Sequence, residues 1–372
     1  MDSCLQEIKR NFGFGFMRLP MLDNGEVDTV QCNQMVDAFL QAGFHYFDTA
    51  RGYLSGKSEL ALRECLTSRY PREAYLLANK LSQGFFQKEE DIRPFFKSQL
   101  EACGVDYFDV YLMHAITAKS YPLYVSCRAF EIARELKEEG SIRHIGMSFH
   151  DKAEVLDMIL AEHPEIEVVQ LQFNYVDFDD PVIQSEACYR VCEKYHKPVI
   201  VMEPVKGGAL VHLPEEGKKI LQELGSESEA SYAIRFCASF PQVIMVLSGM
   251  SSMEQMEDNL SFMRQFVPFS EQEYRAVEQI RKVLRQQNTI ACTECRYCTD
   301  GCPKQIAIPD LFSCYNAKQL YRDWNSEFYY GVYTSHGGKA SDCIGCGKCE
   351  NACPQHLPIR NLLKETAALF EK

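Results

Sequence analysis

Residues 75–114 read YLLANKLSQGFFQKEEDIRPFFKSQLEACGVDYFDVYLMH. An apolar run of strand length (75–80) is followed by a segment with helical periodicity (91–102) and then by a second apolar run (108–114). Short apolar strands that alternate with amphipathic helices are typical of parallel strands joined by crossover helices. This stretch therefore predicts one β–α–β unit.

The same alternation extends in both directions, from residue 13 to residue 265. Apolar runs predict strands at 13–17, 44–48, 75–80, 108–114, 142–148, 168–174, 198–202 and 243–248. Helical periodicity follows each of them, at 30–41, 58–69, 91–102, 129–139, 152–162, 182–195, 229–240 and 253–264. Eight such units predict an α/β fold, a (β/α)8 (TIM) barrel. A doubly wound open sheet is the alternative, but such sheets usually carry a Gly-rich phosphate loop after the first strand, and this sequence has none.

Cysteines mark a second domain after the barrel. The chain has 17 of them, and nine lie in residues 292–372. A charged helical segment at 270–287 separates this tail from the last strand–helix unit. We therefore expect a barrel domain at residues 1–288 and a small α-helical, ferredoxin-like iron–sulfur domain at residues 289–372.

The tail carries the same motif twice, C-x2-C-x2-C-x3-C-P, starting at Cys292 and at Cys343. In this motif three closely spaced thiolates bind one [4Fe–4S] cluster, and the cysteine before proline binds the other. One cluster is therefore assigned Cys292, Cys295, Cys298 and Cys353, and the other Cys343, Cys346, Cys349 and Cys302. Zinc and disulfides are the alternatives, but zinc sites favour paired C-x2-C hooks and disulfides need an oxidising compartment.

Composition narrows the remaining classes. A formal net charge of −13 argues against a nucleic-acid partner, which favours a basic surface. The first ten residues lack the apolar core of a secretory signal, and no stretch approaches 18 uncharged apolar residues. We expect a cytoplasmic protein with no membrane span.

Four polar residues lie where the predicted barrel strands end. Asp48, Lys80 and His114 end the second, third and fourth strands, and Tyr53 lies in the loop after Asp48. Each has a structural explanation when it is taken alone, but barrel active sites lie at the carboxyl ends of the strands. A lysine there needs a carboxylate partner, and its ammonium group would lower the pKa of a nearby tyrosine. This set therefore predicts carbonyl reduction, with Tyr53 as general acid and His114 polarising the carbonyl oxygen.

The motifs FDTARGY (47–53), GKSE (56–59), ANK (78–80) and YLMH (111–114) resemble those of the aldo-keto reductases, over residues 10–265. Together with the tail, the chain resembles the ferredoxin-fused branch of that superfamily. The resemblance implies a nicotinamide dinucleotide bound across the barrel mouth and a small carbonyl or alcohol substrate. It places Ser148 and Gln170 at the nicotinamide carboxamide, and Gln255 and Asn259 on the adenosine side.

Three positions depart from the family pattern. Phe149 follows Ser148, where many relatives have asparagine, and Met202 occupies the position of an aromatic residue that often stacks on the nicotinamide. No lysine or arginine occurs between Ser248 and Leu260, where a basic residue often binds the 2′-phosphate of NADP. The choice between NAD and NADP therefore stays open.

Three functions follow for the two halves together. The first is an NAD(P)-dependent oxidoreductase whose clusters are structural, sense redox state or exchange electrons. The second is a ferredoxin-type electron-transfer protein whose barrel binds nicotinamide or a redox protein partner. The third is a sensing module without turnover, which the complete set of four residues makes the weakest hypothesis. A nicotinamide transfers two electrons as hydride and a cluster transfers one, so direct exchange between them calls for a flavin or a radical intermediate, and no flavin motif is recognisable.

Overall fold

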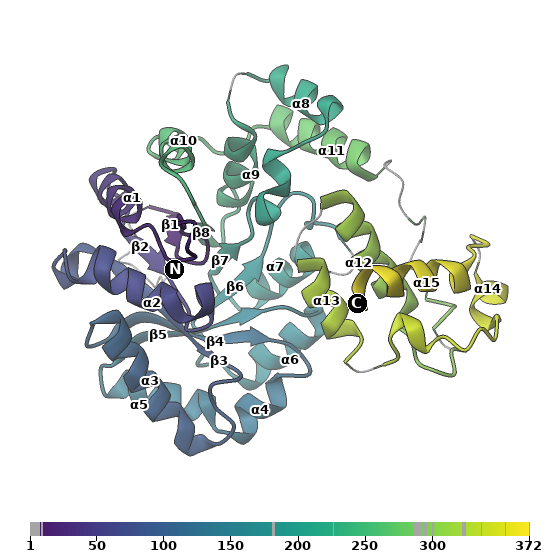
Figure 1. The fold of residues 1–372 in the computed structure, drawn as a ribbon, viewed down its shortest axis with the longest axis horizontal. Coiled ribbons are helices and arrows are strands. Elements are labelled where there is room, and N and C mark those ends of the chain that lie inside the picture. The colour runs from purple at the N-terminus through teal and green to yellow at the C-terminus, as the bar shows by residue number, and fades with distance from the viewer. Residues whose placement is uncertain are drawn as a thin grey trace. The chain divides into compact units, whose positions relative to one another are not determined.

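The computed structural model describes residues 8, 10–180, 183–225, 227–285, 290, 292, 296–299, 301–321, 325–335, 337–353 and 355–371. Its eight parallel strands form a closed barrel in chain order, so each strand pairs with the next and the last pairs with the first (Figure 1). The strands are β1 (Phe12–Gly15), β2 (Tyr46–Asp48), β3 (Leu76–Ser82), β4 (Phe108–Ile116), β5 (Ile142–Phe149), β6 (Val168–Gln172), β7 (Val199–Met202) and β8 (Val243–Ser248). The predicted barrel is confirmed.

A helix follows each strand. These helices are α1 (Thr29–Gln41), α2 (Lys57–Leu62), α3 (Glu89–Cys103), α5 (Ala129–Glu138), α6 (Ala153–Glu162), α7 (Ser185–Lys194), α9 (Glu229–Ala238) and α10 (Met253–Met263). The connections add the short elements η1 (Tyr53–Gly56), η2 (Arg63–Thr67), η3 (Arg72–Ala74), α4 (Tyr121–Ser126), η4 (Lys206–Val211) and α8 (Glu215–Gln222).

The main differences from the predicted elements lie at loops. The helix expected at 58–69 is α2 followed by a π-helical turn, η2. The strand expected at 168–174 ends at Gln172 because the Asn174 side chain turns the chain, accepting hydrogen bonds from the backbone N–H groups of Val176 and Asp177. Helices α4 and α8 were not predicted, since each is too short to give a clear period.

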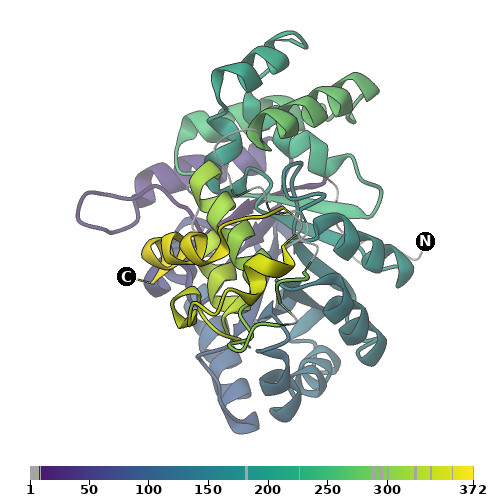
Figure 2. The ribbon, with the colours of Figure 1, turned by 90° about the vertical axis from the view of Figure 1, so that its right-hand side faces the viewer.

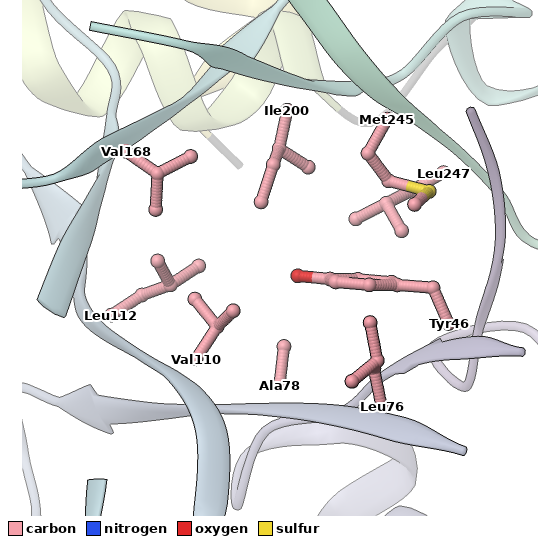
Figure 3. Packing of buried hydrophobic residues seen from close by; sticks show 9 residues of the cluster. All are labelled: Tyr46, Leu76, Ala78, Val110, Leu112, Val168, Ile200, Met245 and Leu247. Carbon is pink, nitrogen blue, oxygen red and sulfur yellow. The ribbon is translucent and has the colours of Figure 1, made fainter. Parts of the chain in front are cut away.

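Apolar side chains fill the interior of the barrel. Figure 3 shows the cluster, which is formed by Tyr46, Leu76, Ala78, Val110, Leu112, Val168, Ile200, Met245 and Leu247. Strands β1 and β5 contribute glycine to this layer. A Cβ atom on Gly146 would lie 2.6 Å from side-chain atoms of both Leu112 and Val168, and one on Gly13 would lie 2.8 Å from Leu247. The large neighbours therefore occupy the space that side chains on β1 and β5 would need.

The chain divides into two compact units. The first comprises Met1–Pro204 and Ala230–Glu271, and the second comprises Val205–Glu229 and Gln272–Lys372. The second unit contains η4, α8, α11 (Glu271–Arg285), α12 (Ile308–Tyr321), α13 (Asn325–Tyr333), η5 (Ala340–Asp342), α14 (Lys348–Ala352) and α15 (Ile359–Phe370). Within it, α12 packs against α13 and α15, drawn in yellow-green and yellow in Figures 1 and 2. The boundary expected at residue 288 stays a prediction.

Hydrogen bonds attach the end of the chain to this second unit. Glu371 accepts hydrogen bonds from the hydroxyl groups of Tyr330 and Ser341, and the ring of Tyr330 stacks on Phe370 at 4.5 Å between centroids. The end of α15 is therefore tied to α13 and to the turn that precedes the second cysteine motif. In the described part of the chain, we find no helix with the length and apolar character that a membrane crossing requires.

Candidate functional site

A polar layer lies directly above the apolar core of the barrel. Side chains two positions apart on a strand face the same way, so the residues that follow inward core positions by two also face the interior. These residues are Asp48 after Tyr46, Lys80 after Ala78, His114 after Leu112, Ser148 after Gly146 and Gln170 after Val168. Five of the predicted site residues thus meet at the carboxyl ends of neighbouring strands.

Asp48 and Lys80 form a buried ion pair in this layer. Lys80 Nζ lies 2.5 Å from Asp48 Oδ1 and donates a second hydrogen bond to the Thr49 carbonyl oxygen at 2.9 Å. The side chain of Asp48 is 4% exposed and that of Lys80 is 0% exposed. The same ammonium group lies 4.8 Å from the centre of the Tyr53 ring. The lysine is therefore fixed by two acceptors, with the tyrosine beside it.

The charges of the pair depend on each other. Burial alone would lower the pKa of Lys80, but the neighbouring Asp48 carboxylate and Tyr53 raise it above its ordinary value. Burial raises the pKa of Asp48, and the charge of Lys80 opposes that shift. Lys80 therefore keeps its ammonium charge at neutral pH, and the loss of either charge would leave the other buried without a partner.

Tyr53 enters the site from η1, the turn after β2. Its connection is tightly bent, because Leu54 and Ser55 both have positive φ (50° and 55°). Burial raises the pKa of Tyr53 above the ordinary tyrosine value, and the Asp48 and Glu203 carboxylates add to this, whereas Lys80 lowers it. Lys80 lowers the pKa of Tyr53, as expected from the sequence, but burial, which that expectation did not include, outweighs this effect.

His114 lies on β4, the strand next to that of Lys80. Its ring meets that of Tyr53 edge to face, with 5.9 Å between centroids, and its Nδ1 lies 2.6 Å from the hydroxyl oxygen of Ser82. Burial holds the pKa of His114 well below its usual range, and the charges of Lys80 and His150 act in the same direction. The imidazole is therefore neutral at physiological pH and can donate a hydrogen bond, but it carries no positive charge.

Ser148 and Gln170 lie side by side on β5 and β6, where they are paired in the sheet register. The Ser148 hydroxyl oxygen accepts a hydrogen bond from the Ala115 N–H at 2.8 Å, and Gln170 Nε2 reaches Asp48 Oδ2 at 3.5 Å. Both side chains are buried. The structure therefore brings these two predicted nicotinamide contacts into the same layer as Asp48 and Lys80.

Gln255 and Asn259 lie on α10, the helix after β8. Gln255 accepts a hydrogen bond from the Ser251 N–H at 2.8 Å, and Asn259 donates one to the Ser248 hydroxyl at 3.0 Å. Within the described residues, both side chains bond only to the β8–α10 connection. The structure does not bring them to the polar layer, and their assignment to the adenosine side stays a prediction.

Two further site residues were not found from the sequence. Ser82 ends β3 and is paired with His114 in the register of β3 and β4. Glu203 follows β7 with a positive φ of 57°, and its Oε1 lies 3.1 Å from the Arg18 guanidinium group. Its Oε2 is buried and has no hydrogen-bond partner among the residues that the structure describes. Continuing the two-residue period past Lys80 would have pointed to Ser82, whereas Glu203 has no sequence signal that we recognise.

A second buried network supports the strand that carries Lys80. Glu59 accepts hydrogen bonds from the side-chain amides of Asn79 and Gln99, both at 3.0 Å, and pairs with Arg51 at 2.5 Å. Gln99 also donates to the Lys80 carbonyl oxygen at 3.1 Å. Arg51 is thus engaged by Glu59, and this network fixes the backbone at Lys80.

In the second unit, the cysteines line two partly open cavities. One, of about 330 Å³, is lined by Cys302, Cys343, Cys346 and Cys349, together with Ile306, Ile308 and Leu363 among others. The other, of about 320 Å³, is lined by Cys292, Cys298 and Cys353, with Phe312 and Ile359 among its apolar neighbours. Cys295 lies outside the described residues. In each cavity a cysteine from one motif meets cysteines of the other, which is the crossed grouping expected from the spacing.

The donor sets of these cavities fit iron–sulfur clusters. Thiolate sulfur is the usual protein ligand of [4Fe–4S] iron, and the apolar lining limits access of water. Cys314, which matches no motif position, is buried in α12 and lines neither cavity.

Comparisons with known proteins agree with both parts. A family model described as "Aldo/keto reductase family" matches residues 11–282, and one described as "4Fe-4S dicluster domain" matches residues 291–358. An NADH-specific methylglyoxal reductase of Escherichia coli (strain K12) is 29% identical over 176 residues, which cover 41% of this chain and 51% of that protein, so the match spans about half of the relative. The L-galactose dehydrogenase of Arabidopsis thaliana is 27% identical over 67% of this chain and 82% of its own length.

Solved structures share the fold of the barrel. The holo form of the aldo-keto reductase AKR11C1 from Bacillus halodurans matches with a TM-score of 0.59 and 24% identity, over 73% of this chain and 91% of that chain. An aldo-keto reductase from Klebsiella pneumoniae, solved in complex with NADPH, matches with a TM-score of 0.58 and 18% identity, over 73% of this chain and 90% of that chain.

Proposed function

Because the chain belongs to the aldo/keto reductase family, we propose that its barrel interconverts a small carbonyl compound and an alcohol by hydride transfer with NADH or NADPH. The observation that carries this proposal is the buried Asp48–Lys80 ion pair beside the Tyr53 ring, with a neutral His114 in edge-to-face contact with that ring. This arrangement provides a proton donor, a charge that stabilises the donor after it loses its proton, and a hydrogen-bond donor for the carbonyl oxygen.

Each residue has one role in the direction of reduction. A nicotinamide dinucleotide bound at the barrel mouth would supply the hydride for the carbonyl carbon. Tyr53 transfers its hydroxyl proton to the carbonyl oxygen, so that an alcohol forms and the tyrosine becomes a phenolate. Lys80 stabilises that phenolate, and Asp48 holds Lys80 charged and in place. Alcohol oxidation uses the same groups in reverse.

His114 assists as a neutral hydrogen-bond donor. Its lowered pKa means that it has no second proton to give near neutral pH. It can therefore orient and polarise the carbonyl oxygen without competing with Tyr53 for the role of acid. The proton that completes the alcohol then comes from Tyr53.

The nicotinamide contacts are part of the proposal. Ser148 and Gln170 offer a hydroxyl and an amide side by side on neighbouring strands, a donor set suited to a carboxamide. Gln255 and Asn259 are proposed for the adenosine side. NAD and NADP both remain candidates, because no basic residue lies between Ser248 and Leu260.

For residues 289–372 we propose two [4Fe–4S] clusters. Cys292, Cys295, Cys298 and Cys353 would hold one, and Cys343, Cys346, Cys349 and Cys302 the other. Such clusters transfer single electrons. Their role here is structural, sensing or electron-transferring. The electron-transfer role, with a redox protein as partner, is the second candidate function, and the two cysteine-lined cavities are the observation that favours it.

The test of the proposal is the Tyr53→Phe variant. Anaerobically purified protein is assayed with NADH and with NADPH against methylglyoxal, which one relative reduces by name, and against a panel of aldehydes and ketones. Loss of a general acid lowers turnover by about 10²- to 10⁴-fold, so Tyr53→Phe should be nearly inactive with unchanged nicotinamide binding. Tyr70→Phe is the matched control, because that hydroxyl bonds to Asp37 on α1. Full turnover by Tyr53→Phe on every active substrate would refute the proposal.

The second candidate is tested on the same samples. Reduction of the clusters by a low-potential ferredoxin-type donor, followed by absorbance, would support electron transfer. Clusters that respond to no donor would exclude that role.

A further inference from the structure

The orientation of the His114 proton is set by a residue outside the four proposed catalytic positions. Ser82 lies two residues after Lys80 on β3, so its side chain also faces the barrel interior, directly opposite His114 in the strand register. Its hydroxyl oxygen lies 2.6 Å from His114 Nδ1, and the serine is only 7% exposed. This short contact is partly buried, so its direction matters.

The serine hydroxyl has one proton and so can donate one hydrogen bond. Among the described residues, His114 Nδ1 is the hydrogen-bond partner of the Ser82 side chain. If Nδ1 were the donor, the buried serine proton would be left without an acceptor, which costs free energy. An arrangement in which the hydroxyl donates and Nδ1 accepts avoids this cost.

A neutral imidazole that accepts at Nδ1 must carry its proton on Nε2. The His114 ring is neutral because burial, Lys80 and His150 all hold its pKa well below the usual range. In the described part of the chain no side chain is hydrogen-bonded to Nε2. That nitrogen is left for a ligand.

The backbone around His114 is fixed as firmly as its ring. The Tyr124 hydroxyl lies 2.7 Å from the His114 carbonyl oxygen and 2.9 Å from that of Leu81, which joins the ends of β4 and β3. The next residue, Ala115, has a positive φ of 54°, and its N–H is hydrogen-bonded to the Ser148 hydroxyl. With the backbone fixed, turning the ring over to exchange its two nitrogens would break the contact between Nδ1 and the Ser82 hydroxyl.

We propose that Ser82 is a positioning residue, which locks His114 as the Nε2–H tautomer and so presents a fixed N–H donor to the substrate oxygen. This assignment rests on the proposed function for its catalytic meaning, but the tautomer itself is a property of the ligand-free protein. It explains how His114 can polarise a carbonyl oxygen while Tyr53 alone supplies the proton. It also makes the serine hydroxyl, through the imidazole, part of the device that orients the substrate.

The deciding measurement is the tautomer of His114 in full-length protein. The protein is labelled with ¹⁵N-histidine and purified anaerobically, and long-range ¹H–¹⁵N correlation distinguishes protonated from bare ring nitrogens. His114→Gln identifies the signal among the nine histidines. We expect a protonated Nε2 and a bare Nδ1 in the wild type, a mixture of tautomers in Ser82→Ala, and the wild-type pattern in Ser82→Thr, which keeps the hydroxyl.

Ser185→Ala is the matched control. Ser185 is a buried barrel serine whose hydroxyl bonds to the Gln172 carbonyl oxygen, so this variant loses a comparable hydrogen bond without touching His114. A wild-type Nδ1–H tautomer would overturn the proposal, and so would a pure Nε2–H tautomer in Ser82→Ala. If Ser185→Ala mixed the tautomers as well, a general loosening of the barrel would be the cause, and the proposal would fail.

Kinetics provide a second readout that separates this inference from the proposed function. With methylglyoxal or the best carbonyl probe of the panel, kcat should fall about two- to tenfold in Ser82→Ala, with little change in nicotinamide binding, and should recover in Ser82→Thr. If Tyr53→Phe is inactive but Ser82→Ala changes neither tautomer nor kcat, the inference alone fails. If the His114 tautomer changes in Ser82→Ala as expected but Tyr53→Phe keeps full turnover, the proposed function fails. The inference that Ser82 fixes the His114 tautomer then still holds.

Discussion

Replacing Lys80 by methionine should destabilise the barrel strongly. The substitution keeps most of the side-chain volume but removes the ammonium group 2.5 Å from Asp48 Oδ1. Within the described parts of the chain, the other Asp48 oxygen has only the long 3.5 Å contact to Gln170. The carboxylate would therefore be left buried and almost without partners there. Breaking a buried ion pair in this way costs about 3–5 kcal/mol, whereas removing both charges often costs little. Asp48→Asn/Lys80→Met should therefore be more stable than Lys80→Met.

The loss of stability should depend on pH with a definite sign. Burial already raises the pKa of Asp48, and removal of Lys80 takes away the charge that opposes this rise. The folded variant then binds a proton more tightly than the unfolded chain, whose aspartate pKa is about 3.9. The loss of unfolding free energy in Lys80→Met is thus small near the pKa of Asp48 in the unfolded chain. It grows as the pH rises toward the pKa of Asp48 in the folded variant. Above that value it stays constant.

Urea unfolding followed by circular dichroism measures this effect, in anaerobic samples whose cluster absorbance confirms an intact second unit. Lys194→Met is the matched control. Lys194 also lies 2.5 Å from an aspartate, Asp157, but both side chains are largely exposed, so little change is expected. The reasoning is wrong if Lys80→Met unfolds at the wild-type midpoint at neutral pH, if its deficit grows as the pH falls, or if the double variant is no more stable than Lys80→Met.

Three further predictions concern other parts of the chain. Glu203→Gln should lower the pKa of Tyr53, because the Glu203 charge helps to raise it. The alkaline limb of the pH profile for carbonyl reduction should therefore move to lower pH. A limb that does not move, or that moves to higher pH, would contradict this prediction. Cys353→Ser should reduce bound iron from about eight to about four atoms per chain, whereas Cys314→Ser should leave the iron content unchanged, and equal losses would refute the grouping. Glu371→Gln should lower the thermal midpoint for loss of cluster absorbance, since it weakens the attachment of the end of α15, and an unaltered midpoint would show that this attachment is dispensable.

Much of the barrel could be predicted because each of its strands leaves a local signal. The apolar runs are of strand length, and the helices between them have a clear period. The same two-residue period places Asp48, Lys80 and His114 above apolar positions, so the polar layer follows from counting along each strand. The cysteine grouping was similarly accessible, since the motif spacing decides which thiols can reach one cavity.

Residues whose roles depend on two strands at once could not be found this way. Ser82 contacts His114 because the register of β3 and β4 places the two residues opposite each other. The sequence of either strand alone does not determine that register. Glu203 depends on a backbone with positive φ and on an arginine 185 positions earlier. Neither position resembles a motif, and both become visible only when the barrel closes.

The direction of the Tyr53 pKa illustrates the same limit and clarifies the proposed mechanism. A lysine beside a tyrosine suggests a lowered pKa, but burial and two carboxylates outweigh the effect of the lysine. This favours a tyrosine that stays protonated until the reaction needs its proton. The low-dielectric surroundings that raise the pKa also strengthen the attraction between Lys80 and a developing phenolate, because Coulomb interactions grow as the dielectric constant falls. Burial thus keeps Tyr53 protonated before hydride transfer. The buried ammonium group of Lys80 then stabilises the phenolate that forms when Tyr53 gives up its proton.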